Sequence, residues 1–366
     1  MSEIVHDLAV LAPVGRLTTW LDAHVPQLGD GPLRTALLSG GTSNVVLTLQ
    51  RSGGDRGGPS MVLRRPPAVP PPGAENGVLR EARVLTALRG SDVPHPTCHA
   101  SCDDPTVIGA PFYVMDKVQG WAPNLRDETI HNEPPFDAMP YTYGIPFAIV
   151  DGLVALANVD YRAVGLGDYG KPEGFLERQV DRWAGQLASY KQRYAYAGRD
   201  IAGYTEVEGW LRRNVRETRH AGIIHGDVGT PNMMFHYAPP ARLAAMIDWE
   251  LSTIGDPMLD LGWFCGAMRD ERWDDVTSGS GLNNPDHFPT RQELARYYCA
   301  GTGRDPAEFD YYLVLAGFKS GCLLEYKVAQ AAAGILPTKT GEFFARIVDA
   351  AFARNARFVE RLAKGL

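Results

Sequence analysis

The stretch that decides the fold reads IIHGDVGTPN over residues 223–232, and MIDWE follows over residues 246–250. Asn232 stands five residues after Asp227, and Asp248 stands sixteen residues after Asn232, with strand-like apolar residues ahead of each aspartate. Transfer of a phosphoryl group needs a carboxylate near the acceptor hydroxyl and oxygen ligands for Mg²⁺. The spacing predicts Asp227 as the catalytic base, Asn232 and Asp248 as magnesium ligands, and His225 as a brace for the loop.

Each half of this pattern has a purely structural alternative. The His-Gly-Asp turn could cap a strand, and Asp248-Trp249-Glu250 could be a solvated acidic turn. Both halves occur in the order of a kinase catalytic loop and its metal-binding aspartate, and each follows residues that predict a strand. The combination favours the kinase interpretation, which the upstream residues can test.

A hairpin with a glycine turn is expected upstream, over residues 37–49. Backbone N–H groups of such a turn can face the phosphate oxygens of a nucleotide. An ordinary β-turn with two glycines would look the same, so the hairpin gains weight only from its order and distance to later motifs. The residues predicted to contact the nucleotide here are Ser39, Gly40, Gly41, Thr42, Ser43 and Asn44.

The next predicted strand, MVLRR over residues 61–65, carries the cation expected to contact the phosphates. Side chains alternate along a strand, so Val62 and Arg64 share one face, and Leu63 and Arg65 share the other. We favour Arg64 as the inward residue and keep Arg65 as the alternative. Kinases carry Lys at this position, and the exchange matters because Arg presents a planar fork where Lys presents a point charge.

The periodicity of residues 76–88 predicts a helix with Glu81 beside its apolar stripe. Glu81 is the expected partner of Arg64 and would hold it towards the nucleotide. The alternative is an exposed carboxylate that pairs with Arg80 or Arg83 along the same helix.

Residues 111–120 predict an apolar strand that runs into the connection between two lobes. In a kinase this hinge meets the adenine base, so the backbone of Asp116, Lys117 and Val118 is expected to face the base. Met115 would lie near the adenine ring, although plain core packing explains Met115 equally well.

Taken together, these motifs resemble the aminoglycoside phosphotransferase family over most of the chain. Within that family, the chain is similar to the subgroup that includes the kinase-like region fused to some acyl-CoA dehydrogenases. The motifs that carry the resemblance are SGGTSN at 39–44, VLRRPP at 62–67, RE at 80–81, VIGAPFYVM at 107–115 and GDP at 255–257.

The resemblance implies an α+β, protein-kinase-like fold with two lobes. Residues 1–120 would form a small lobe with an antiparallel β-sheet and a helix, and residues 121–366 a larger, mostly helical lobe. It implies ATP or GTP as the donor, Mg²⁺ as the metal, and a hydroxyl of a small molecule as the acceptor. Because hydroxyacyl thioesters are the acceptors of the fused relatives, a hydroxyacyl-CoA is the leading hypothesis, with a functional link to an acyl-CoA dehydrogenase. The subgroup also tends to carry Arg at the position of Arg64.

Three other functions remain open at this stage. Antibiotic-modifying members of the family use acidic residues to hold polycationic sugars, and the nearest candidate here, residues 270–275, reads more simply as a solvated face. A nucleotide-binding regulator without transfer would have no need of Asp227. A protein kinase would need more room for a peptide-binding segment than the eleven residues between Asp248 and Asp260 provide.

Composition is consistent with a two-lobed enzyme. A chain of 366 residues, 45% of them hydrophobic, can bury a large core. The net charge of −7 disfavours nucleic acid as a partner, and no apolar run of about 18 residues predicts a membrane span. The first residues lack the pattern of a secretory signal, and five cysteines fit reduced thiols, so we expect a cytoplasmic protein of undetermined oligomeric state.

Two further features have simple explanations. A group of possible zinc ligands, His95, Cys98, His99 and Cys102, would alternate between the faces of an extended segment and could not converge without a tight turn. The proline-rich run at 66–72 fits a stiff connection between strand and helix. Residues 121–146 are expected to be irregular, and helices are predicted at 147–158, 174–194, 206–220, 291–302, 306–332 and 341–362.

Overall fold

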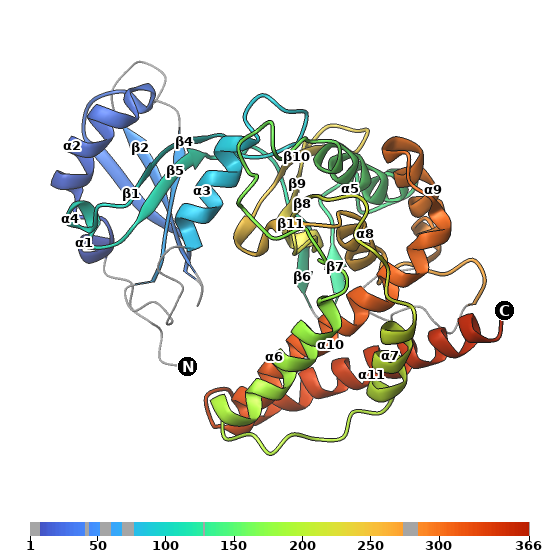
Figure 1. The fold of residues 1–366 in the computed structure, drawn as a ribbon. Coiled ribbons are helices and arrows are strands. Elements are labelled where there is room, and N and C mark those ends of the chain that lie inside the picture. Colours follow the sequence, from blue (N-terminus) through green and yellow to red (C-terminus); the bar gives the residue numbers. More distant parts are fainter. Residues whose placement is uncertain are drawn as a thin grey trace. The chain divides into compact units, whose positions relative to one another are not determined.

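The computed structural model describes residues 8–40, 44–51, 60–67, 77–126, 129–273 and 285–365 (Figure 1). The chain divides into two compact units. Unit 1 contains the residues up to Gly120 together with Ala244–Ser252, and unit 2 contains Trp121–Leu243 and Thr253–Leu366. Asp248 therefore belongs to unit 1, whereas Asp227 and Asn232 belong to unit 2.

Unit 1 is built on one five-stranded sheet with the order β1-β2-β3-β5-β4, and each neighbouring pair is antiparallel. The strands are β1 (Leu33–Gly40), β2 (Val45–Arg51), β3 (Met61–Arg65), β4 (Cys98–Cys102) and β5 (Phe112–Asp116). The helices are α1 (Leu8–Leu11), α2 (Val14–His24), η1 (Pro26–Leu28), α3 (Gly77–Ala87), α4 (Pro105–Ile108) and η3 (Trp249–Leu251).

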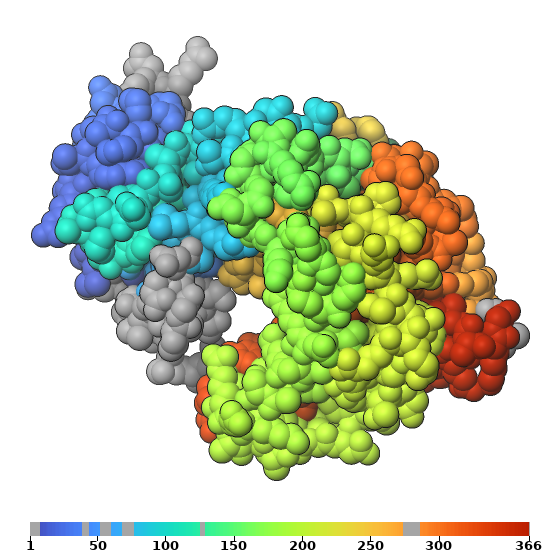
Figure 2. Space-filling view, viewed as in Figure 1, coloured from blue at the N-terminus to red at the C-terminus, as the bar shows by residue number. Residues whose placement is uncertain are grey.

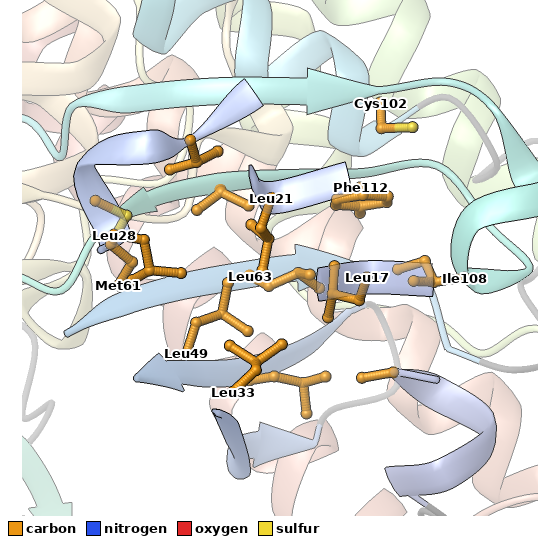
Figure 3. Packing of buried hydrophobic residues seen from close by; sticks show 14 of the residues in the cluster. Leu17, Leu21, Leu28, Leu33, Leu49, Met61, Leu63, Cys102, Ile108 and Phe112 are labelled. Atoms are coloured by element: carbon orange, nitrogen blue, oxygen red, sulfur yellow. The ribbon is translucent and has the colours of Figure 1, made fainter. Parts of the chain in front are cut away.

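The core of unit 1 lies on one face of this sheet, under α2 (Figure 3). Leu17 and Leu21, one turn apart on α2, are fully buried and belong to the same cluster as Met61 and Leu63 of β3 and Phe112 of β5. Because alternate residues of a strand share a face, Met61 and Leu63 commit that face of β3 to the core and turn Arg64 to the other face. Each such leucine contributes about 1.5–3 kcal/mol through burial.

Unit 2 is mostly helical. Its longer helices are α5 (Tyr141–Ala157), α6 (Gln179–Arg193), α7 (Tyr204–Arg213), α8 (Met258–Cys265), α9 (Arg291–Thr302), α10 (Phe309–Ala332) and α11 (Thr338–Ala363). Short elements connect them: β6 (Asn124–Arg126), β7 (Thr129–His131), β8 (Gly222–Ile224), η2 (Thr230–Asn232), β9 (Met233–Phe235), β11 (Thr253–Gly255), η5 (Pro285–His287) and η6 (Pro306–Glu308). Strand β10 (Leu243–Met246) begins at the last residue before the segment that belongs to unit 1. β6 pairs with β7, and β8 pairs with β11, both antiparallel.

Helices α10 and α11 form the main packed pair of unit 2, and α6 and α7 pack against them. Figure 2 shows residues of α6 and α7, in yellow-green, as a continuous surface of unit 2. Gly321 of α10 lies directly against the ring of Phe352 of α11, so a side chain at position 321 would collide with that ring. In the part of the chain that the structure describes, no helix combines the length and apolar composition needed to cross a membrane.

The largest errors in the predicted helix boundaries concern α5, α6 and α7. Helix α5 begins at Tyr141 and contains Pro146, so the segment predicted to be irregular ends earlier than expected, and it also contains β6 and β7. Helix α6 begins at Gln179, after Gly174 adopts a left-handed φ of 60°. Helix α7 ends at Arg213, because the Asn214 side chain donates to the Trp210 carbonyl and caps the last turn.

Candidate active site

Arg64 is the central cation of unit 1. Its guanidinium lies 3.3 Å from a Glu81 oxygen, 2.6 Å from an Asp248 oxygen and 3.5 Å from a Glu250 oxygen. Burial alone would lower the pKa of Arg64, but the nearby Glu81 and Asp248 raise it. Arg64 is 7% exposed, so the group is held charged and oriented by carboxylates on α3 and around η3.

Arg65 has a different environment on the opposite face of β3. Its guanidinium donates to the Leu11 carbonyl at 2.5 Å, to the Ile108 carbonyl at 2.9 Å and to the Pro66 carbonyl at 3.1 Å. It therefore ties the sheet to the ends of α1 and α4. This geometry favours Arg64 over Arg65 as the residue that would contact phosphates.

Glu81 is the predicted partner of Arg64, and the structure brings the two together. The carboxyl is 1% exposed and accepts a hydrogen bond from the Tyr113 hydroxyl at 3.1 Å. Burial raises the pKa of Glu81 to about 8, Arg64 opposes this rise, and the charges of Asp248 and Glu250 add to it. Three carboxyl groups thus share one guanidinium, which leaves an acidic site suited to a further cation.

The acidic group fits a magnesium ion by its chemistry. Ligand oxygens of Glu81, Asp248 and Glu250 lie within 4.8 Å of one another. Asp248 adopts a left-handed backbone with φ 66°, and its side chain is 35% exposed, as is 33% of the Glu250 side chain. Mg²⁺ prefers one or two carboxylates together with water and phosphate oxygens, so Asp248 and Glu250 are suitable donors.

Glu250 was missed by the sequence interpretation, which considered it only as part of a solvated acidic turn. Its Oε2 accepts a hydrogen bond from the Asn44 amide at 3.1 Å, so the predicted phosphate hairpin has one residue beside this acidic group. Of the other predicted hairpin residues, Gly41, Thr42 and Ser43 lie outside the described residues. Ser39 and Gly40 are described only as the end of β1.

The catalytic loop of unit 2 begins directly after β8. Asp260 of α8 accepts from the backbone N–H of His225 at 2.6 Å and from that of Gly226 at 2.9 Å. Gly226 has a φ of 87°, a conformation that favours glycine. Lys319 of α10 donates to the Gly226 carbonyl at 2.7 Å. Asp260 of α8 and Lys319 of α10 therefore both hold the backbone at Gly226, the residue immediately before Asp227.

Asp227 and Asn232 lie together at the other end of the loop. The Asn232 amide nitrogen donates to the Asp227 backbone carbonyl at 3.1 Å and to its Oδ2 at 3.0 Å. Because Asp227 offers only acceptors in these bonds, the NH₂ group faces it and the amide oxygen is turned away, as a metal ligand would be. His225 is 0% exposed, and its Nδ1 accepts a hydrogen bond from the Asp227 N–H at 3.3 Å. His225 therefore supports the backbone of the loop from the buried side.

Lys319 and Asp260 were not assigned to the site from sequence. Burial lowers the pKa of Lys319 to about 8, with Asp260 and Asp227 opposing this, and burial raises the pKa of Asp260 to about 6. The signal for Lys319 was a single lysine among apolar residues in the middle of α10, a position where a charge needs a buried partner.

The N–H of Asp116 donates to the Thr97 carbonyl at 3.0 Å. The expectation that backbone groups of Asp116, Lys117 and Val118 face adenine stays a prediction. The Asp116 side chain accepts a hydrogen bond from His99 Nε2 at 2.6 Å, which engages one member of the possible zinc group. Met115, Lys117 and Val118 are partly exposed.

The interpretation of residues 270–275 as a solvated face is wrong for Asp270. Asp270 is 3% exposed and pairs with Arg291 at 2.7 Å and with Arg272 at 3.1 Å. Burial alone would raise its pKa, but the hydrogen bonds from Arg272 and the charge of Arg291 lower it to about 2. Neutralised in this way, Asp270 is not available to hold a polycationic sugar.

These two sets of residues define a class of protein. An Asp-Asn loop held in place, an aspartate among carboxyl groups and an arginine paired with a helix glutamate are the kinds of parts that an enzyme transferring phosphoryl groups needs. Comparison with known proteins gives the family.

A family model described as the phosphotransferase enzyme family matches residues 34–311. Acyl-CoA dehydrogenase family member 11 of Gallus gallus is 30% identical over 348 residues, which are 92% of this chain and 42% of that protein. The structure of a candidate aminoglycoside phosphotransferase from Ralstonia eutropha JMP134 has 28% identity and a TM-score of 0.75, covering 94% of this chain and 98% of the other. The GDP and kanamycin complex of APH(2")-IIia has 14% identity and a TM-score of 0.59, covering 92% and 98%.

The chain belongs to the phosphotransferase enzyme family. The predictions of an α+β, protein-kinase-like fold and of a phosphotransferase acting on an alcohol group are confirmed. The resemblance to the kinase-like region of acyl-CoA dehydrogenase relatives is confirmed as well, and the chain spans less than half the length of those relatives.

Proposed function

We propose that this protein is a small-molecule kinase that transfers the γ-phosphate of ATP, or of GTP, to a hydroxyl group of a hydroxyacyl-CoA. The observation that carries the proposal is the loop from His225 to Asn232, in which every bond described above fixes the position of Asp227. A fixed carboxylate is what the reaction asks of the protein at the acceptor, because positioning supplies most of the catalysis.

The proposed step is a direct in-line transfer. The acceptor oxygen bonds to the γ-phosphorus, the bond from that phosphorus to the bridging oxygen breaks, and the nucleoside diphosphate leaves with the bonding electrons. Asp227 accepts the hydroxyl proton at a carboxylate oxygen. Arg64, held by Glu81, would bind phosphate oxygens of the nucleotide. Mg²⁺, held by Asn232 and Asp248, would neutralise the charge that develops on the phosphates.

Two observations support a metabolic acceptor over an aminoglycoside. The similarity to acyl-CoA dehydrogenase family members, which carry such a region beside a second activity, connects the chain to acyl-CoA chemistry. The one acidic run considered for a cationic sugar has its buried member, Asp270, paired with Arg291 and Arg272. A functional link to a separate acyl-CoA dehydrogenase is part of this proposal.

An acceptor panel tests the proposal. Mg²⁺-dependent turnover of ATP and of GTP is measured with 3- and 4-hydroxyacyl-CoAs, kanamycin, choline and simple sugars. We expect transfer to the hydroxyacyl-CoAs alone, confirmed by the mass of the phosphorylated product. Transfer only to kanamycin would replace the acceptor assignment, and nucleotide binding without transfer to any compound would favour a regulator.

A further inference from the structure

A cavity of about 520 Å³ lies in unit 2 among α8, α10 and α11. Small residues of these three helices form part of its lining, and a cavity of this volume accommodates a small organic ligand. Those small residues are Gly262 and Gly266 at α8, Ala316 and Gly317 of α10, and Ala350 and Ala351 of α11.

The rest of the cavity wall is apolar with a cationic side. Trp263, Leu313, Phe343 and Ile347 are among the residues that line it. Ala350 is exposed, so the cavity reaches the surface beside α11. An apolar wall of this kind suits a hydrocarbon chain, which gains about 0.8 kcal/mol per CH₂ group buried.

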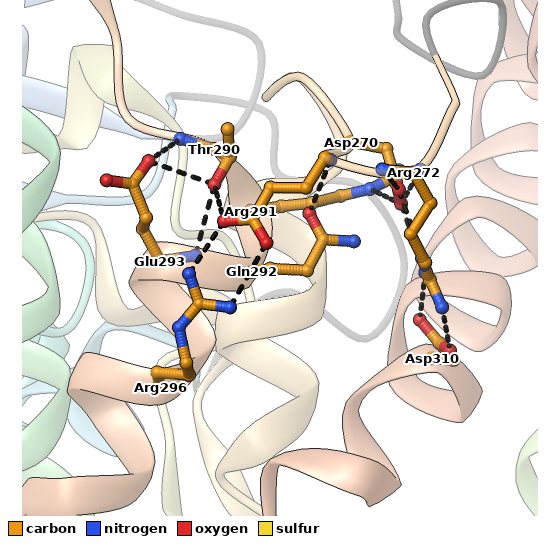
Figure 4. A network of polar contacts seen from close by, with 9 residues as sticks. Asp270, Arg272, Thr290, Arg291, Gln292, Glu293, Arg296 and Asp310 are labelled. Carbon is orange, nitrogen blue, oxygen red and sulfur yellow. Dashed lines mark hydrogen bonds and ion pairs between the residues drawn. The ribbon is translucent and has the colours of Figure 1, made fainter.

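Three arginines also line the cavity: Arg291, Arg346 and Arg354. Arg291 is neutralised by Asp270, whose carboxylate lies 2.7 Å away, within the polar network of Figure 4. Arg354 has no hydrogen bond or ion pair with any residue in the described part of the chain. Burial, together with the charges of Arg291 and Arg357, lowers the pKa of Arg354 to about 10.

Within the described ranges of the chain, no carboxylate pairs with Arg354 beside this apolar cavity, and an anion that binds here would balance its charge. Its planar fork matches a carboxylate or a phosphate. The protein as a whole is acidic, with a net charge of −7, so this local excess of positive charge is not a general property of its surface. Both the shape and the charge of the cavity therefore suit one kind of ligand.

We propose that this cavity binds an anionic amphiphile, with its hydrocarbon chain among α8, α10 and α11 and its carboxylate or phosphate on Arg354. The claim that this cavity holds the acceptor substrate rests on the function proposed above. The claim that it binds an anionic amphiphile does not. The anionic group could be a free carboxylate or the phosphates of a coenzyme carrier, and the test separates these sources.

Lys319 connects the cavity wall to the catalytic loop. Its ammonium lies 4.3 Å from the centre of the Trp263 ring, and the same ammonium donates to the Gly226 carbonyl next to Asp227. Trp263 lines the cavity. A ligand chain that contacts Trp263 is therefore separated from the loop that carries Asp227 only by the side chains of Trp263 and Lys319. Trp263 also supplies an intrinsic fluorescence signal for occupancy.

Binding is measured on the full chain by calorimetry and tryptophan fluorescence, with decanoate, decanoyl-CoA and decanol as probes. We expect decanoate or decanoyl-CoA to bind and decanol to bind at least tenfold more weakly. Arg354→Met should weaken the better anionic probe about tenfold, because it removes a charge-assisted hydrogen bond. Ala350→Phe, at the exposed end of the cavity, should weaken all three probes.

The matched control is Lys339→Met, which removes an exposed cation of the same helix that does not line the cavity. It should leave the affinities unchanged. A preference for decanoate assigns a free carboxylate, and a preference for decanoyl-CoA assigns the coenzyme phosphates. Equal binding of decanol, or unchanged affinity in both Arg354→Met and Ala350→Phe, would overturn the inference.

The failure of this inference is distinguishable from the failure of the proposed function. If phosphoryl transfer to a hydroxyacyl-CoA is unaffected by Arg354→Met and Ala350→Phe, the cavity does not hold the acceptor, and the proposed kinase function still stands. If both variants weaken the binding of the anionic probes but no acceptor is phosphorylated, the cavity is a binding site and the proposed kinase function is wrong.

Discussion

Arg64 and Arg65 are neighbours in sequence with opposite environments. Arg64 lies among three carboxyl groups, and Arg65 lies among backbone carbonyls. A strand alternates its side chains, so two adjacent arginines cannot serve the same face. The functional candidate and the structural one can therefore be separated by matched substitutions.

Arg64→Lys keeps the charge but loses the fork that now spans Glu81 and Asp248. We expect kcat/KM for ATP to fall by about tenfold or more, the equivalent of one charge-assisted hydrogen bond, with little change in thermal stability. Arg65→Lys is the control: its free energy of unfolding should fall by about 1–3 kcal/mol, because carbonyl partners are lost, while KM for ATP stays the same. The reverse pattern would assign the phosphates to Arg65.

The pair of Asp260 and Lys319 predicts the pH dependence of turnover. As the pH falls through about 6, Asp260 takes up a proton and loses its strength as acceptor for the His225 and Gly226 N–H groups, so kcat should fall on the acid side. The charged or titratable groups facing Asp260 are Lys319 of α10, Asp227 of the loop and Tyr298 of α9.

Lys319→Met should move this acid limb to higher pH. Lys319 is the cation that favours the ionised form of Asp260, so its removal raises the pKa of that carboxyl. The measurement is the pH profile of kcat for the wild type, for Lys319→Met and for Lys327→Met, a control on the same helix. If the acid limb of the kcat profile stays in place or moves to lower pH in Lys319→Met, Lys319 is not the cation that favours the ionised form of Asp260.

How far the site could be predicted depends on sequence separation. Asp227 and Asn232 lie in one short loop, so their spacing, combined with the later Asp248 segment, identified them as candidates. Asp260 and Lys319 reach the same loop from 35 and 93 residues away, and no local pattern encodes those contacts. Glu250 was overlooked because a turn with two acids looks solvated until a buried arginine is known to face it.

At the scale of elements, α8 positions the catalytic loop because it carries Asp260 and packs closely on α10. Gly262 makes this approach possible: a Cβ added there would lie 2.5 Å from the Tyr312 carbonyl oxygen. The strands and long helices were predictable from periodicity, and α9 has the predicted bounds of 291–302. The errors lie at helix ends, where a single residue such as Asn214 determines where the helix stops.

Gly262→Ala should therefore disturb both stability and catalysis. The added methyl group must push α8 away from α10, at a cost of about 1–3 kcal/mol in the free energy of unfolding, and kcat should fall as Asp260 shifts. Chemical denaturation and steady-state kinetics measure the two effects. Gly185→Ala in α6, where nothing lies within 4 Å of the added carbon, should be neutral or stabilising by about 0.4–1 kcal/mol. Equal behaviour of the two variants would refute this role for Gly262.

At the scale of the whole molecule, the proposed metal ligands come from both units: Asp248 from unit 1 and Asn232 from unit 2. Asp248→Asn should raise the Mg²⁺ concentration for half-maximal activity at least tenfold, because a carboxylate ligand becomes a neutral one. Glu250→Gln should raise it less, and Asp103→Asn, an exposed residue of unit 1, should not change it. Unchanged metal dependence in Asp248→Asn would contradict the assignment.

The central claim is that Asp227 accepts the proton of the acceptor hydroxyl. The most direct test is the single-turnover rate of phosphoryl transfer, with nucleotide and acceptor bound at saturation, in the wild type, in Asp227→Asn and in Asp200→Asn, an exposed control in unit 2. We predict a fall of about 10²–10⁴-fold in Asp227→Asn alone, with nucleotide affinity retained. Equal transfer rates in all three proteins would contradict the claim.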